Sequence, residues 1–328
     1  MKNKNSRIGI AVIGAVLFVL CLLSLRFGST YIGWRDFFAA LFSREGSAAV
    51  ILYGIRLPRL CGGLVAGVGL AVSGLLLQSI TDNKMASPNL VGVSSGAGFA
   101  VILTLSVAAV PTVFLPFAAF VGAFFATLVI VSISSRLGMG KGTVVLVGLA
   151  FGSVLSAGIS LLSLLDSDVL ADYNAFSIGS LSGIELSDIA IPALLVALSF
   201  AAVRVLAYRI NLLSLGDTAA GALGVNVKRL RALCMLLASA SAAAAVSFAG
   251  LLGFVGLMAP HIARAFFGAD TRRLVTPTAM LGALLVTASD LLGRLLFAPS
   301  ELPVGIIMSL LGAPFFLGLL LWGGRKNA

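Results

Sequence analysis

Side chains that could carry out chemistry are few in this sequence. His261 is the only histidine, and it directly follows Pro260. A lone histidine beside a helix-breaking proline is typical of a structural or helix-end residue, and it leaves no room for a histidine-based metal site or triad. The cysteines lie far apart in apolar segments without motif spacing, as small core residues do: Cys21, Cys61 and Cys234. The sequence therefore predicts no catalytic residue, no metal site and no cofactor.

One glycine-rich stretch, GMGKGT at residues 138–143, is partly similar to a phosphate-binding loop. That loop has the pattern G-x-x-x-x-G-K-[ST]. Here Ser135 stands where the first glycine should be, and Gly142 follows the lysine. We therefore predict that the chain has no nucleotide site of its own, so energy for any transport must come from a partner or from an ion gradient.

The longest polar interruption of the chain runs from residue 208 to residue 231 and carries four basic residues against one acid. Its middle, residues 213–225, is expected to form two short helices. Asp217 is expected to cap the second of them, and Gly221 and Gly224 permit tight turns. A compact, basic, helical loop in a membrane protein typically contacts a soluble partner. The alternative is that the stretch is a solvated connector.

Composition places these segments in a membrane. Hydrophobic residues make up 59% of the 328 residues and charged residues only 10%, whereas soluble domains carry about 25% charged residues. The 37 glycines are also typical of helices that approach one another closely in lipid. We predict an all-α integral membrane protein that forms a single domain over residues 1–328.

Ten apolar segments are long enough to cross about 30 Å of hydrocarbon. The first is expected to be a retained helix, because no signal-peptidase site follows it. A polar excursion with aromatic residues, at residues 27–57, separates the first two segments. The ten expected spans are residues 8–25, 59–80, 89–110, 117–135, 143–165, 189–207, 232–249, 250–267, 277–296 and 304–322.

The distribution of basic residues predicts the orientation. With ten spans both termini lie on one side, and sixteen of the 22 lysine and arginine residues then fall on the side of the termini. By the positive-inside rule that side is the cytoplasm. The net charge of +10 follows from this topology, so nucleic-acid binding is not needed to explain it.

Ionisable residues are almost absent from the spans, which argues against proton or sodium coupling. Asp290 and Arg294 lie one helical turn apart near the outer end of the ninth span and are close enough in sequence to pair. An ion-coupled secondary transporter of a small metabolite remains the alternative function, and a structural or signalling membrane protein is a third.

Several motifs in order resemble the permease subunits of bacterial ABC importers for iron-siderophore, haem and cobalamin uptake, known as FecCD-type permeases. These motifs are GIRLPRL at 54–60, AGVGLAVSGLLLQSITDNKMASPNLVGVSSGAGF at 66–99, LSLGDTAAGALGV at 213–225, FAGLLGFVGLMAPHIAR at 248–264 and ELPVGIIMSLLGAPFF at 301–316. The resemblance covers nearly the whole chain. It implies the type II ABC importer architecture, with ten helices and cytoplasmic termini, in a bacterial plasma membrane.

The resemblance also implies the partners and the cargo. A second permease subunit, identical or paralogous, would complete a central pathway. Two ATPase subunits would bind on the cytoplasmic side, and an extracytoplasmic binding protein would deliver the substrate. A ferric siderophore is the favoured cargo because it is the commonest in the family, with haem and cobalamin as the others.

Site residues follow where this sequence matches the family motifs. The ATPase-coupling loop would comprise Leu215, Gly216, Asp217, Ala220, Leu223 and Gly224. The cationic sites for the binding protein would be Arg56, Arg59 and Arg294. Alternatively, Arg56 and Arg59 anchor the second span at the headgroups, and Arg294 only pairs with Asp290. An inner gate would involve Asn83, Met85 and Thr143, for which simple loop packing is the alternative.

Overall fold

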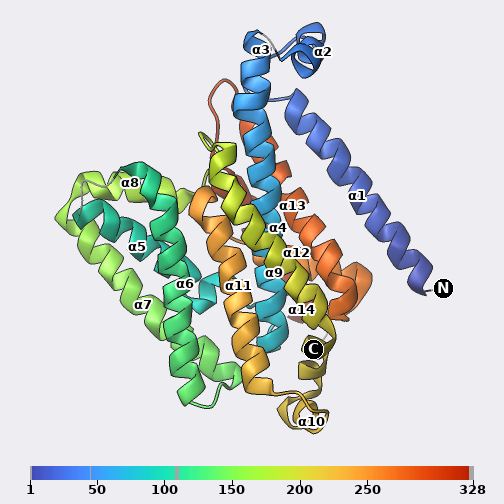
Figure 1. Ribbon diagram of the computed structural model, residues 1–328, viewed down its shortest axis with the longest axis vertical. Helices are drawn as coiled ribbons and strands as arrows, with labels where there is room; N and C mark the ends of the chain where they lie inside the picture. The colour runs from blue at the N-terminus through green and yellow to red at the C-terminus, as the bar shows by residue number, and fades with distance from the viewer. Residues whose placement is uncertain (1, 45, 108–110, 325–328) are drawn as a thin grey trace.

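Apolar segments in lipid must satisfy their backbone hydrogen bonds internally, and the chain does so with helices. The computed structural model describes residues 2–44, 46–107 and 111–324, and every regular element in these ranges is helical (Figure 1). In chain order the elements are α1 (Lys2–Arg26), α2 (Trp34–Ser43), α3 (Ser47–Ala49), the π-helical η1 (Val50–Arg56), α4 (Leu57–Thr81), η2 (Pro88–Val91), α5 (Val93–Val107), η3 (Thr112–Phe114), α6 (Leu115–Arg136), α7 (Lys141–Leu165), α8 (Ser167–Ile178), α9 (Leu186–Leu212), η4 (Leu213–Leu215), α10 (Asp217–Ala222), α11 (Val227–Ala249), α12 (Val255–Phe267), α13 (Thr271–Leu295) and α14 (Val304–Gly324).

The described residues contain seven helices long and apolar enough to cross a membrane, and three shorter apolar helices lie in α5, α12 and α14. Each of the ten expected spans overlaps one of these helices. The prediction of an all-α integral membrane protein with about ten spans is therefore confirmed.

Three of the expected boundaries were wrong. The eighth span begins at Val255 rather than Gly250, because Gly250 and Phe254 adopt positive φ angles of 70° and 65°, which an α-helix cannot contain. The third span begins at Val93, after the short turn η2. The excursion at residues 27–57 is not simply a polar loop, because α2 lies in it and a continuous helical segment runs from Ser47 through η1 to the end of α4.

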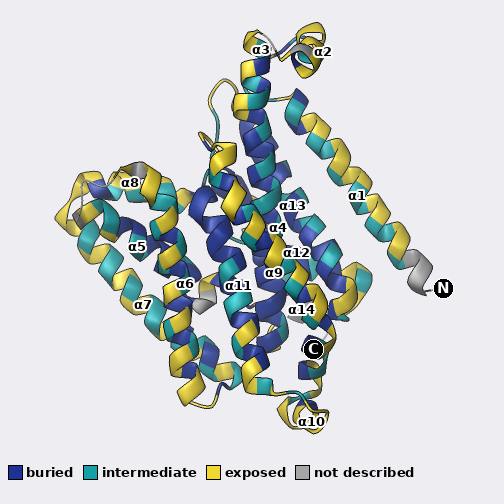
Figure 2. Ribbon diagram, in the orientation of Figure 1, coloured by how far each residue is buried: buried dark blue, intermediate teal, exposed yellow. Residues whose placement is uncertain are grey.

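Helix α4 is the centre of the bundle. Most of its residues are buried, and it packs against α9, α11, α12 and α13. Glycines permit the closest approaches, since an added Cβ at Gly67 would overlap the backbone of Gly282 on α13 and one at Gly74 would overlap Gly256 on α12. Figure 2 shows α4 largely dark blue, whereas α1, on the outside of the bundle, alternates between exposed and intermediate residues and is almost nowhere buried.

The two ends of the bundle carry different short elements. Helices α2 and α3 lie at one end, and α10 lies at the opposite end, as Figure 1 shows. The residues that were predicted to bind partners therefore fall into two separate regions, which are described in turn.

Candidate functional site

The predicted coupling loop forms the two short helices expected, η4 and α10. Gly216 and Gly224 make the turns around α10, with φ of 92° and 81°, values that favour glycine. The turn at Gly224 was predicted, whereas Gly221 lies inside α10. The prediction that Asp217 caps this helix was wrong. The N-cap position belongs to Gly216, which has no side chain, and Asp217 is the first helical residue.

One side of this loop is buried against the bundle, and the other side is exposed. Leu213 is 1% exposed and Ala220 is fully buried, so both hold the loop against the bundle. Leu215 and Leu223 point outward and are 59% and 60% exposed. Two exposed leucines on a short helical loop are a surface that a protein partner can cover.

The carboxylate of Asp217 is used by Arg231 of α11. Arg231 Nη2 donates to Asp217 Oδ1 at 2.9 Å, and Nη1 donates to Oδ2 at 3.2 Å and to the carbonyl oxygen of Met139 at 2.5 Å. These bonds from Arg231 hold the pKa of Asp217 below its usual value. Sequence reasoning missed Arg231. The signal for it was that Arg231 shares a helical face with Cys234 and Ala238, both of them buried.

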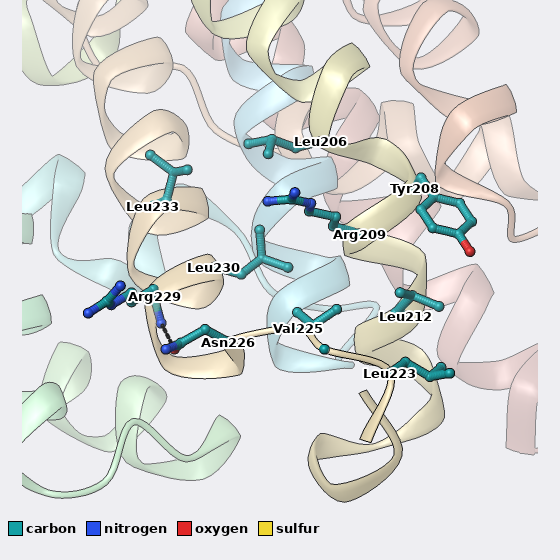
Figure 3. A pocket seen from close by; sticks show the side chains of 11 residues that line it. Leu206, Tyr208, Arg209, Leu212, Leu223, Val225, Asn226, Arg229, Leu230 and Leu233 are labelled. Carbon is teal, nitrogen blue, oxygen red and sulfur yellow. Dashed lines mark hydrogen bonds between the residues drawn. The ribbon is translucent and has the colours of Figure 1, made fainter. Parts of the chain in front are cut away.

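A cavity of about 460 Å³ lies beside the coupling loop, between α9 and α11 (Figure 3). Leu223 and Gly224 of the loop line one side of it, and Leu206 and Arg209 extend toward it from α9. Asn226 caps α11 at its edge by accepting from the backbone N–H of Arg229 at 3.1 Å. The coupling loop is therefore bordered by a hollow with basic side chains.

The predicted gate residues lie on two segments that an ion pair joins. Asn83 and Met85 are exposed residues of the loop after α4, where Asn83 Oδ1 accepts from the backbone N–H of Met85 at 2.9 Å. Thr143 lies in the first turn of α7. Lys141 Nζ lies 3.0 Å from Asp82 Oδ2, which holds the start of α7 beside the loop. The gate role of these residues stays a prediction.

At the other end, the predicted pair of Asp290 and Arg294 is confirmed, with Asp290 Oδ2 2.9 Å from Arg294 Nε. The same carboxylate receives Arg59, whose Nη2 donates to Oδ1 at 3.0 Å. Arg59 also donates to Glu301, in the segment before α14, and Glu301 accepts from Ser29 at 2.6 Å. Burial raises the pKa of Glu301, but the bonds from Arg59 and Ser29 outweigh it, so the net pKa is lowered.

None of the three predicted docking arginines has an exposed guanidinium. Arg56, Arg59 and Arg294 are 2%, 4% and 2% exposed. Arg56 donates to the backbone carbonyls of Leu25 and Arg26 at 2.9 and 2.7 Å. All three arginines are thus buried within the protein, and the alternative that Arg56 and Arg59 anchor the second span at the headgroups stays untested. Docking of a partner through them stays a prediction.

His261 lies within α12 and packs its ring edge-to-face against Phe315 of α14, with 6.0 Å between the ring centroids. This contact suits a structural residue. Over residues 2–44, 46–107 and 111–324, no group of three or more His, Cys, Asp and Glu side chains is close enough to hold a metal ion.

Comparisons with known proteins place this arrangement. Residues 16–322 match the model of the FecCD transport family. The chain is 34% identical to the Fe(3+)-citrate import system permease protein YfmE of Bacillus subtilis, over 99% of this chain and 98% of that one. It is 36% identical to the hemin transport system permease protein HmuU of Yersinia pestis, over 94% and 95% of the two chains. It is also 38% identical to the cobalamin import system permease protein BtuC of Halobacterium salinarum, over 85% of this chain and 75% of that one.

The fold has a solved counterpart. A metal-chelate type ABC transporter in an inward-facing conformation superposes with a TM-score of 0.82 at 28% identity, and the match covers 96% of this chain and 98% of that one. Similarity over the full length, in sequence and in fold, leads to one assignment: the chain belongs to the FecCD transport family and is a transmembrane permease subunit of an ABC importer.

Proposed function

We propose that this permease carries a ferric siderophore, or a related chelate such as haem or cobalamin, across a bacterial plasma membrane. The names of the relatives support this class of cargo, since they include ferric citrate, hemin and cobalamin systems. All three are metal chelates. The siderophore is our choice among them because it is the commonest cargo of such permeases.

The observation that carries the energetic part of the proposal is the coupling loop. Leu215 and Leu223 stand exposed on a loop whose other side is buried, and the adjacent cavity can receive a side chain of a partner. We assign this surface to an ATPase subunit on the cytoplasmic side. With a second permease, identical or paralogous, two such loops would contact two ATPase subunits.

The opposite end, with α2 and α3, is assigned to the extracytoplasmic binding protein. Arg59 is the arginine best placed to reach an incoming acid, because its partner Glu301 has 27% of its side chain exposed. Docking through Arg56, Arg59 and Arg294 would require each to exchange an internal acceptor for one on the binding protein. Asn83, Met85 and Thr143 would narrow the inner mouth of the pathway.

Uptake by a reconstituted complex tests the cargo and the energy source together. The permease, its ATPase and its binding protein are placed in liposomes, and the uptake of ferric siderophores, ferric citrate, haem and cobalamin is measured with and without ATP. We expect uptake of a ferric chelate that requires both ATP and the binding protein. Uptake driven by a proton or sodium gradient without the ATPase would instead establish the ion-coupled secondary transporter.

A further inference from the structure

Arg231 is one of the largest fully buried side chains of the protein, at 1% exposure. Its guanidinium bridges two elements that are distant in sequence, because it bonds to Asp217 on α10 and to the carbonyl oxygen of Met139 between α6 and α7. A buried guanidinium is costly unless its donors are well paired. Bidentate pairing with a carboxylate also fixes the relative orientation of the two groups.

The Met139 side of this bridge is a rigid turn. Met139 has a φ of 58°, its side chain is fully buried, and its N–H donates to Ser134 of α6 at 2.7 Å. Gly138 before it also has a positive φ, of 95°. Because α7 begins at Lys141, only two residues after Met139, a displacement of this turn also displaces the start of α7.

The next contact leads to the loop after α4. Lys141 Nζ lies 3.0 Å from Asp82, which ends α4 with a φ of 52° and directly precedes Asn83. The two side chains are 33% and 62% exposed. Exposed ion pairs contribute only about 0–1 kcal/mol, so this contact is easily opened. Of these contacts, the buried bonds of Arg231 are the strong ones, and the exposed pair of Lys141 and Asp82 is the one that can open easily.

We propose that Arg231 is a positioning residue for transport, which transmits movement of α10 through the Met139 turn and the Lys141–Asp82 pair to the loop of Asn83 and Met85. The inference rests on the proposed function, in which α10 contacts the ATPase. A purely structural arginine would need only an acceptor in the bundle. Arg231 instead takes both acceptors from the connecting segments that a moving partner would displace.

The test uses the complete complex of permease, ATPase and binding protein in liposomes. The variants are Arg231→Lys, which keeps the charge but loses the fork of donors, Arg231→Gln, and Asp217→Asn, which acts at the half-exposed partner and keeps its volume. Asp172→Asn is the matched control, because Asp172 is an exposed acid on α8, for which the structure shows no ion pair. Three quantities are measured: ATPase co-purification, stimulation of ATP hydrolysis by loaded binding protein, and substrate imported per ATP.

We expect the Arg231 variants to retain the bound ATPase and its basal hydrolysis. They should lose the stimulation of hydrolysis by loaded binding protein and import about tenfold less substrate per ATP. A loss of this size is what we expect when one hydrogen bond to a charged group is removed. Asp217→Asn should also lower the amount of substrate imported per ATP. This variant therefore tests the proposal even if an Arg231 variant does not fold. Native import per ATP in Asp217→Asn and Arg231→Lys would overturn the proposal, as would loss of the ATPase from a folded Arg231→Gln complex.

A double-variant cycle tests the order of the contacts. If Arg231 and Asp82 act in series, Asp82→Asn should add little to the loss already caused by Arg231→Gln. If the losses caused by Asp82→Asn and Arg231→Gln instead multiply in the double variant, the two residues act independently and the proposed order of contacts is wrong. Gly224→Phe separates this inference from the proposed function. If Gly224→Phe keeps the ATPase and uptake, the coupling loop itself is wrongly assigned, whereas loss of the ATPase there with native behaviour of the Arg231 variants removes only the positioning role.

Discussion

Arg59 of α4 and Asp290 of α13 form a buried ion pair, with 3.0 Å between Nη2 and Oδ1 and no more than 5% exposure of either side chain. Asp290 also holds Arg294, so one carboxylate serves two guanidinium groups. Because α4 is the centre of the bundle, this pair joins α4 to α13 at the end of the core opposite the coupling loop. It also brings the segment before α14 into contact through Glu301.

Removing the shared carboxylate should be strongly destabilising. Asp290→Ala removes the acidic partner of Arg294 and one of the two acidic partners of Arg59, and breaking a buried pair from one side costs about 3–5 kcal/mol. We expect a lower unfolding temperature and a poor yield of the purified subunit, measured by thermal unfolding in detergent. Asp172→Ala, an exposed acid on α8, is the control and should change little. Equal unfolding temperatures for the two variants would contradict the role of the pair.

The pair of Arg59 and Glu301 should be lost at low pH. The pKa of Glu301 is lowered in the folded protein, so its carboxylate stabilises the fold above the pKa of the unfolded chain, which is about 4.3. That contribution disappears as the pH falls through the lowered pKa, when the carboxyl group is protonated. We expect the unfolding temperature of the native protein to fall more than that of Glu301→Gln as the pH is lowered from well above to well below the unfolded pKa of about 4.3. Parallel profiles would show that Glu301 contributes nothing.

The spans were predictable because apolar length is a local property of the sequence. The pair of Asp290 and Arg294 was predictable for the same reason, since its partners lie one helical turn apart on α13. The contact between Arg59 and Glu301 was not, because 242 residues separate them. The charge count used to predict the orientation carries no information on burial, so it could not show that Arg56, Arg59 and Arg294 are buried.

The coupling loop shows the same limit at finer scale. Two short helices were predicted within residues 213–225, and these are present. The position of the cap was wrong by one residue, because the cap is Gly216 and the carboxylate of Asp217 is drawn to Arg231 instead. Arg231 lies on another helix, so the sequence around Asp217 does not predict this contact.

Close packing of α4 on α12 gives a prediction about small residues. A Cβ at Gly74 would overlap the backbone of Gly256, so Gly74→Ala must push the two helices apart. Overpacking of this kind costs about 1–3 kcal/mol. Gly318→Ala on α14 meets open space and should be neutral or slightly stabilising, since alanine is the better helix former. Thermal unfolding of both variants checks this, and a Gly74→Ala protein as stable as Gly318→Ala would contradict the packing.

Docking of the binding protein through Arg59 would require release from Glu301. Glu301→Gln weakens the internal bond and should therefore strengthen binding, while added salt should weaken the native contact. Affinity of the purified complex for the binding protein is measured at low and high salt. Asp188→Asn, on the same acidic outer side but bonded only to the backbone N–H of Glu185, is the control. Weaker binding by Glu301→Gln would mean that Glu301, and not Arg59, faces the partner.

The exposed leucines of the coupling loop provide the most direct test of the ATPase contact. Leu215 and Leu223 are 59% and 60% exposed, so Leu215→Asp with Leu223→Asp should leave folding nearly unchanged but place charges in the proposed apolar interface. We expect the ATPase to be lost on co-purification and uptake to cease, while the unfolding temperature of the isolated permease stays close to the native value. Leu213→Asp is the opposite control, because Leu213 is 1% exposed and a buried charge there should destabilise the permease itself. Retention of the ATPase by a folded double variant would return residues 213–225 to the status of a solvated connector.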